Sequence, residues 1–120
     1  MTQVATNSGS NLEISVHQQG EGTVVRLDGR VNVDSSPDLR DQLLGILSAA
    51  SNPRTVTVDL SGVSYIETSG IATLIEALRI ARHRQIGFCL QGLGGSVLRL
   101  FEVTGTLMLF DHNDRGKGVA

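Results

Sequence analysis

The sequence predicts a single α/β domain whose mixed sheet of about five strands carries helices mainly on one face, in the order β-β-α-β-α-β-α-β. Short runs rich in β-branched residues recur along the chain, and segments with apolar residues at helical spacing lie between most of them. The first two strand-like runs follow one another directly, which indicates a hairpin. A length of 120 residues suits one hydrophobic core. Together these observations imply one mixed sheet with covering helices.

The first part of the chain predicts a hairpin followed by a helix. Residues 12–17 alternate apolar and polar side chains, and residues 23–28 form a second strand after a turn at residues 20–22. Ser35 or Ser36 can cap the helix that follows, with Pro37 near its first position. The apolar stripe of that helix consists of Leu39, Leu43, Ile46 and Leu47.

The central part of the chain, residues 55–78, predicts a strand, a short apolar link at 63–66, and a helix that begins at residues 67–70. The buried face of this helix consists of Ile71, Leu74, Ile75 and Leu78. Thr68 and Ser69 stand where a helix leaves its first N–H groups without partners, so either hydroxyl could cap it. A phosphate is also well placed at such a position, in the positive end of the helix dipole.

The remaining segments complete the predicted domain. A fourth strand is expected at residues 88–91, a short helix at 96–103 and a last strand at 107–110. Polar composition predicts a flexible N-terminal tail at 1–11 and a polar C-terminal tail at 111–120, so the domain spans 12–110. Basic residues from Arg79 to Arg84 are interpreted as a solvated complement to a helix C-terminus.

Composition argues against several functional classes. A net charge of −2 and few aromatic residues favour neither nucleic acid nor an anionic membrane as partner. No apolar run has the length needed to insert across a membrane, and there is no leader pattern, so a cytoplasmic protein is expected. Cys89 is the only cysteine, and the histidines lack metal-ligand spacing. No base accompanies the hydroxyls, so we expect neither catalysis nor a metal or cofactor.

Three segments, in the right order, resemble one family. Residues 59–74, which read DLSGVSYIETSGIATL, look like the signature of STAS domains and specifically of bacterial anti-sigma-factor antagonists. Residues 29–39 are similar to the family segment before the first helix, and residues 97–105 resemble the segment before the last strand. Asn32 and Glu67 stand where the family usually has Asp. The resemblance extends from about residue 12 to residue 110.

This resemblance implies a STAS fold and a regulatory binding function. It implies that Thr68 is the phosphoacceptor, with Ser69 as the alternative. The partner would be an anti-sigma factor that is also a serine/threonine kinase, and a separate phosphatase would reverse the modification. The expected partner surface joins the start of the central helix to the loop before the first helix, and consists of Asn32, Asp34, Ser35, Glu67, Thr68, Ser69 and Gly70. An alternative is a STAS accessory subunit of a membrane lipid-transport ABC complex.

Overall fold

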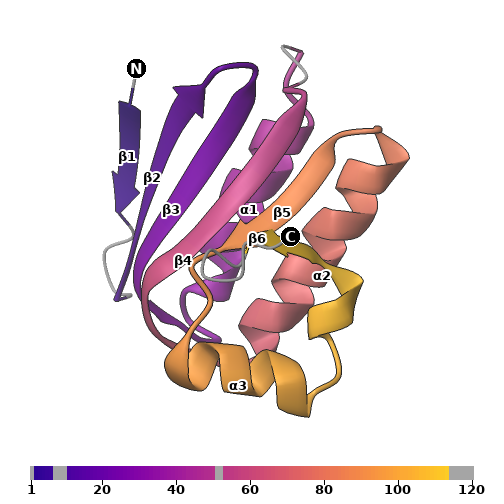
Figure 1. Cartoon of the computed structure of the whole chain (residues 1–120). Helices are drawn as coiled ribbons and strands as arrows, with labels where there is room; N and C mark the ends of the chain where they lie inside the picture. Colours follow the sequence, from indigo (N-terminus) through magenta and orange to yellow (C-terminus); the bar gives the residue numbers. More distant parts are fainter. Residues whose placement is uncertain (1, 7–10, 51–52, 114–120) are drawn as a thin grey trace.

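The computed structural model describes residues 2–6, 11–50 and 53–113, and its strands form one mixed sheet in the order β1-β2-β3-β4-β5-β6 (Figure 1). The strands are β1 (Thr2–Thr6), β2 (Leu12–Gln19), β3 (Gly22–Val31), β4 (Thr55–Ile66), β5 (Gly87–Gln91) and β6 (Asp111–Asn113). The first three strands are antiparallel neighbours. From β3 onward, neighbouring strands are parallel. The predicted fold class is therefore confirmed.

The helices lie mainly on one face of this sheet. They are α1 (Ser36–Leu47), α2 (Thr68–His83) and α3 (Gly95–Val103), followed by the short 3₁₀ helix η1 (Leu107–Leu109). The first two pack side by side behind the sheet, while α3 crosses the end of the sheet at which β4 finishes (Figure 1). Each predicted helix is present, because each carries one apolar stripe that can be buried.

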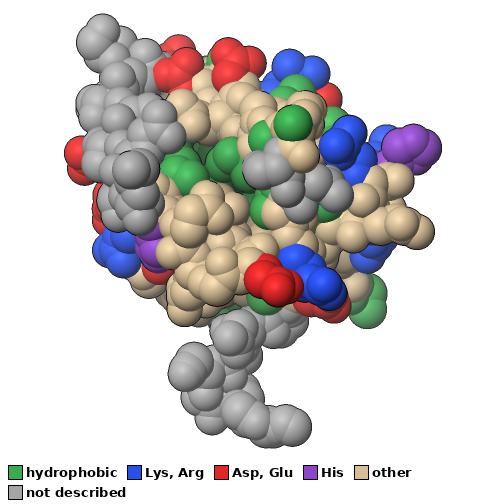
Figure 2. Space-filling model, turned by 90° about the horizontal axis from the view of Figure 1, so that it is seen from above, with side chains coloured by type: hydrophobic (Ala, Val, Ile, Leu, Met, Phe, Trp, Pro, Cys, Tyr) green, Lys and Arg blue, Asp and Glu red, His purple; other side chains and the backbone are tan. Residues whose placement is uncertain are grey.

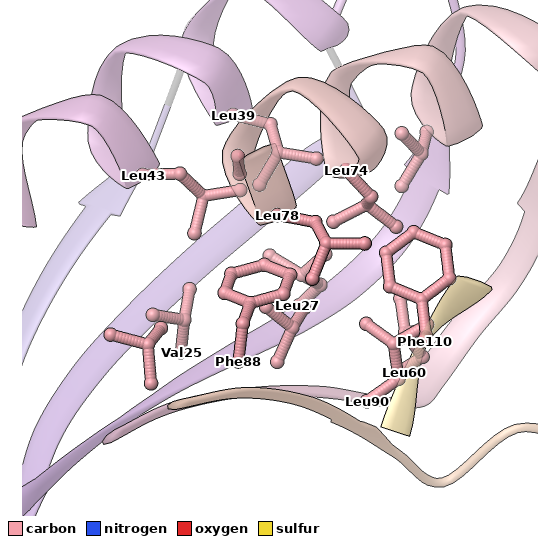
Figure 3. Packing of buried hydrophobic residues seen from close by; sticks show 14 of the residues in the cluster. Val25, Leu27, Leu39, Leu43, Leu60, Leu74, Leu78, Phe88, Leu90 and Phe110 are labelled. Carbon is pink, nitrogen blue, oxygen red and sulfur yellow. The ribbon is translucent and has the colours of Figure 1, made fainter. Parts of the chain in front are cut away.

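The core lies between the sheet and the helices α1 and α2. Figure 3 shows Leu39 and Leu43 from α1 and Leu74 and Leu78 from α2 facing the sheet. The opposing side chains come from alternate strand positions and include Val25, Leu27, Leu60, Phe88 and Leu90. None of these residues is more than 5% exposed. Burying each one stabilises the fold by about 1.5–3 kcal/mol, so this packing holds α1 and α2 against the sheet.

The predicted last strand at residues 107–110 is wrong. Leu107–Leu109 form η1 instead, Phe110 is extended, and the strand β6 begins only at Asp111. Gly105, with φ +71°, ends α3 and lets the chain turn back. The apolar run resembles a strand, but Phe110 is buried through packing against Phe101 and Phe88, at ring distances of 5.8 and 6.5 Å. The packing of Phe110 against other aromatic rings thus explains the apolar residue that had suggested a strand.

The number of strands differs from the prediction of about five because of the short strands at both edges of the sheet. Strands β2 to β5 form its central four-stranded part, and the short strands β1 and β6 flank it. Thr2–Thr6, expected to belong to a tail, pairs antiparallel with β2, whose edge would otherwise leave backbone groups unpaired. Met1 and residues 7–10 of that expected tail, and residues 114–120 of the other, lie outside the described residues. Within the described ranges, no helix has both the length and the hydropathy to span a membrane.

Candidate functional site

The candidate site lies where β3 and β4 end and α1 and α2 begin. Val31 at the end of β3 pairs with Ile66 at the end of β4. The bond from Glu67 N–H to the Val31 carbonyl, at 2.9 Å, continues this pairing beyond the strands. The hydroxyl Oγ of Ser36 donates to Oγ of Ser69 at 3.3 Å and joins the starts of the two helices. The structure therefore brings together the two segments from which the sequence predicted a partner surface.

The start of α2 is capped through the backbone and by neither predicted hydroxyl. Glu67 is the N-cap, with extended backbone at φ −106° and ψ 171°, and no side-chain cap bond is formed. Its carbonyl accepts hydrogen bonds from the N–H groups of Gly70 and Ile71. Thr68 and Ser69 are thus the first and second helical residues, so the expectation that one of them caps the helix is wrong. Capping fails because both residues already have helical backbone, whereas a side-chain cap requires the residue before the helix.

The two candidate hydroxyls differ in exposure. Thr68 is exposed, and its side chain makes no hydrogen bond to any of the described residues. Ser69 is half-buried, accepts the bond from Ser36, and its carbonyl accepts a bond from Oγ1 of Thr73 at 3.0 Å. Among these two side chains, therefore, the one open to an incoming group is Thr68.

The loop before α1 is held by side chains that turn inward. Oδ1 of Asn32 accepts from the N–H groups of Asp34 and Ser35, at 3.0 and 3.1 Å, which forms a tight turn. Oγ of Ser35 accepts from Asn32 N–H at 3.0 Å and donates to the Arg30 carbonyl at 2.9 Å. These bonds leave Asp34 and Val33 exposed at the tip of the turn.

Burial removes two residues from the predicted partner surface. Ser35 is 0% exposed because its hydroxyl replaces backbone partners inside the turn. Gly70 is also buried, and a Cβ at this position would lie 2.5 Å from Cγ1 of Val31 and 2.9 Å from Cγ1 of Ile66. Both residues shape the site from within and cannot themselves contact a partner in this conformation.

Sequence reasoning missed an aromatic and a basic residue beside Thr68. Arg30 and Tyr65 are partners across β3 and β4, and the Arg30 guanidinium stacks over the Tyr65 ring, 4.4 Å from its centroid. The Tyr65 hydroxyl donates to Oε2 of Glu67 at 3.1 Å. Only the strand register brings Arg30 to Tyr65, and two register shifts in this pair of strands hide it from a simple count along the sequence.

A shallow groove adjoins Thr68 on the side of α3. It has a volume of about 430 Å³ and is lined by Tyr65, Ile66, Glu67, Thr68, Ser96 and Leu100. One wall is the start of α2, and the other is the first turns of α3. In the described part of the chain, no cluster of His, Cys, Asp and Glu side chains could hold a metal ion. The arrangement therefore offers an exposed hydroxyl beside a partly apolar binding groove.

Comparison with known proteins places this geometry in a family. The family model described as "Mlab, STAS domain" matches residues 14–108. The chain is similar to the anti-sigma-B factor antagonist of Bacillus subtilis, with 24% identity over 90% of this chain and 96% of that protein. Among solved structures it resembles an anti-sigma factor antagonist from Mycobacterium paratuberculosis, with a TM-score of 0.74, 19% identity and 89% of each chain covered.

A further solved structure has the same fold. The anti-sigma factor antagonist SpoIIAA in its unphosphorylated form aligns with a TM-score of 0.60 and 15% identity, over 74% of this chain and 81% of that chain. At these identities, the structural matches establish the fold alone. The match to the family model covers most of β2 and all of β3, β4, β5, α1, α2 and α3, including the start of α2 with its exposed hydroxyl. This chain belongs to the STAS domain family.

Proposed function

We propose that this protein is an anti-sigma factor antagonist, which acts by binding and not by catalysis. Its partner is an anti-sigma factor that is also a serine/threonine kinase. The unphosphorylated chain binds this partner through the start of α2 and thereby releases a sigma factor. Phosphorylation of Thr68 ends the binding, and a separate phosphatase restores it. The names of the similar proteins support the class of function.

The observation that carries the proposal is the contrast between Thr68 and Ser69. Thr68 is exposed, lies at the first position of α2 and lines the groove beside α3. Ser69, the alternative phosphoacceptor, is half-buried and its hydroxyl is already engaged by Ser36. A kinase would have to break that contact and open the α1–α2 junction to reach Ser69. Thr68 requires no such rearrangement.

A phosphate on Thr68 should change binding far more than folding. It adds about −1.5 to −2 charge at the positive end of α2, where such charge is stabilised by roughly 0.3–1 kcal/mol. This gain offsets part of the repulsion from the neighbouring Glu67 carboxylate. In a docked complex the same phosphate would occupy the groove and lose its water, and a like-charge contact costs several kcal/mol. Since about 1.4 kcal/mol is tenfold in affinity, binding should weaken by at least tenfold.

The proposed partner surface retains five of the predicted residues at the start of α2 and in the loop before α1. Glu67, Thr68 and Ser69 contribute from α2, and Asn32 and Asp34 from the loop. Ser35 and Gly70 support this surface from inside. The substitution Asp34→Arg should weaken partner binding while leaving the free energy of unfolding within about 0.5 kcal/mol, because Asp34 is exposed. A large loss of stability with intact binding would contradict this surface.

The test uses the purified chain with each anti-sigma kinase of the source organism. Thr68→Ala should not be labelled by the cognate kinase, and Thr68→Glu should bind it at least tenfold more weakly than wild type. Ser69→Ala should still be labelled. Ala72→Glu is the matched control, because Ala72 is also exposed and lies one turn further along α2. Labelling of Ser69 in place of Thr68, or equal binding by the phosphorylated chain, would refute the switch.

A second candidate function is an accessory subunit of a membrane lipid-transport ABC complex, which would use the same helix start without a phosphate cycle. One observation favours it: the matching family model carries the description Mlab and not that of an anti-sigma factor antagonist. Co-purification of the tagged chain separates the candidates. Recovery of a transporter ATPase, with no kinase and no phosphorylated Thr68, would favour the second candidate over the first.

A further inference from the structure

The turn from α3 to η1 exposes large apolar side chains. Of the five large hydrophobic residues that are exposed in the described part of the chain, three lie here: Val103 at 73%, Met108 at 85% and Leu109 at 41%. They do not line either described hollow, one of which adjoins Thr68 while the other lies between α1 and β2. These side chains therefore protrude into solvent, where they contribute little burial energy to the folded chain.

The last turns of α2 expose arginines without acidic partners. Arg79, Arg82 and Arg84 are all exposed. The ion pairs formed within the described ranges use other arginines, so none of them neutralises these three. Figure 2, which views the molecule from above, shows basic side chains gathered beside a histidine at one edge. The helix dipole explains why arginines are favourable at the C-terminus of α2. It does not explain why they lie beside the exposed apolar turn from α3 to η1.

One contact joins the arginines to the apolar turn. The guanidinium NH2 of Arg82 donates to the Leu109 carbonyl at 3.2 Å, so η1 lies directly beside the outer face of α2. Arg79 is three residues before Arg82 and shares its face. We call Arg79, Arg82, Arg84, Val103, Met108 and Leu109 the basic–apolar patch. Arg79 lies eleven residues after Thr68 on one continuous helix, roughly 16 Å along its axis, so the patch is a second surface.

We propose that the basic–apolar patch binds reversibly to the surface of a membrane that contains anionic lipid. Cations around protruding apolar side chains match the charge of the headgroups and the apolar layer beneath them. An acidic protein partner would need hollows shaped to Met108 and Val103, whereas a fluid lipid surface adapts to any shape. The three arginines outnumber Glu102 and Asp111, the exposed acidic residues that adjoin the patch along the chain, and the Debye length of about 8 Å at physiological salt screens acidic groups farther away.

The proposal is independent of the function assigned to Thr68. Each arginine near an anionic surface contributes about fivefold to the binding constant, and the contributions fall with rising salt. The apolar side chains make the interaction depend on lipid packing as well as on charge. The complex would be peripheral, since no helix crosses the bilayer in the described ranges.

Flotation of the full-length chain with lipid vesicles tests the proposal. Vesicles of phosphatidylcholine with about 30% of the anionic lipid phosphatidylglycerol serve as the probe, and vesicles of phosphatidylcholine alone as the control. Wild type should float with the anionic vesicles only, and less protein should float as salt rises. Arg79→Glu with Arg84→Glu should weaken binding at least about 25-fold, and Met108→Ser several-fold. Arg30→Glu, the same charge change per site at the end of β3, far from the patch, should bind the vesicles like wild type.

The variants should fold like wild type, because all the replaced side chains are exposed, and circular dichroism can verify this. The proposal is overturned if wild type does not float with anionic vesicles. It is also overturned if Arg30→Glu loses as much binding per substitution as the double variant of Arg79 and Arg84, since net charge and not the patch would then govern binding. Unchanged binding by Met108→Ser would also overturn it, because charge alone, without insertion of the apolar side chains, would then hold the protein on the vesicles.

Discussion

Replacing Gly70 by alanine should destabilise the protein, even though alanine is the better helix former. Gly70 is the third residue of α2 and packs against the ends of β3 and β4. A Cβ there would lie 2.5 Å from Cγ1 of Val31, and 2.9 and 3.2 Å from Cγ1 and Cδ1 of Ile66. Val31 and Ile66 are 0% and 5% exposed, and both are β-branched, so neither can turn away freely.

Two opposing terms set the size of this effect. Alanine gains up to about 1 kcal/mol over glycine in a helix. Adding a methyl group to a tightly packed interior costs roughly 1–3 kcal/mol. Because the contacts are well inside van der Waals distance on two sides, we expect the packing term to prevail, with a net loss of about 1–2 kcal/mol. The shift needed to relieve the contact would also move the start of α2, and with it Thr68.

Chemical and thermal unfolding measure this difference. Gly45→Ala is the matched control, since Gly45 lies in α1 and a Cβ there meets nothing within 4 Å. That variant should be more stable than wild type by about 0.5–1 kcal/mol. The melting temperatures should move in opposite directions, by roughly 4 °C per kcal/mol. If Gly70→Ala is as stable as Gly45→Ala, the close packing of α2 against Val31 and Ile66 is not what positions the site.

Further substitutions probe the supports of the site. Ser35→Ala should cost about 1–3 kcal/mol in urea unfolding, because it leaves the buried backbone groups that its hydroxyl serves without partners. Phe101→Ala should cost about 3–5 kcal/mol and loosen Phe110, which proteolysis after residue 110 would detect. Arg40 lowers the pKa of Glu76 through a hydrogen bond, so this pair stabilises the fold above the unfolded pKa of about 4.3 and its contribution is lost as the pH falls through the folded value. Wild type should be slightly more stable than Glu76→Gln at pH 7, and urea unfolding at decreasing pH should show this small difference disappear as the pH falls through the folded pKa of Glu76, the effect being small because the pair is half exposed.

Local pattern alone predicted most of the fold. The apolar stripes of α1, α2 and α3 and the alternation in β2 and β3 identified these elements, because burial of one face imposes a period on the sequence. Prediction from the local pattern failed at residues 107–110. This segment is apolar because it buries a single aromatic side chain, Phe110, and not because it forms a strand. The pairing of Thr2–Thr6 with β2 was missed as well, since edge pairing depends on backbone groups and leaves little hydrophobic signal.

Local patterns in the sequence are sufficient to predict the neighbourhood of Thr68, since strand ends and helix starts follow from them and the β-α-β order brings these ends to one edge of the sheet. Which residues face outward there depends on contacts between segments that meet only in the folded chain. Ser35 and Gly70 are buried by contacts from other segments, whereas Tyr65 and Arg30 reach the surface together through the register of β3 and β4. Periodicity specifies which face of an element is buried, but partners that are distant in the chain decide whether a polar residue at a junction turns inward. For the same reason the contact between Arg82 and Leu109, 27 residues apart, could not be read from the sequence.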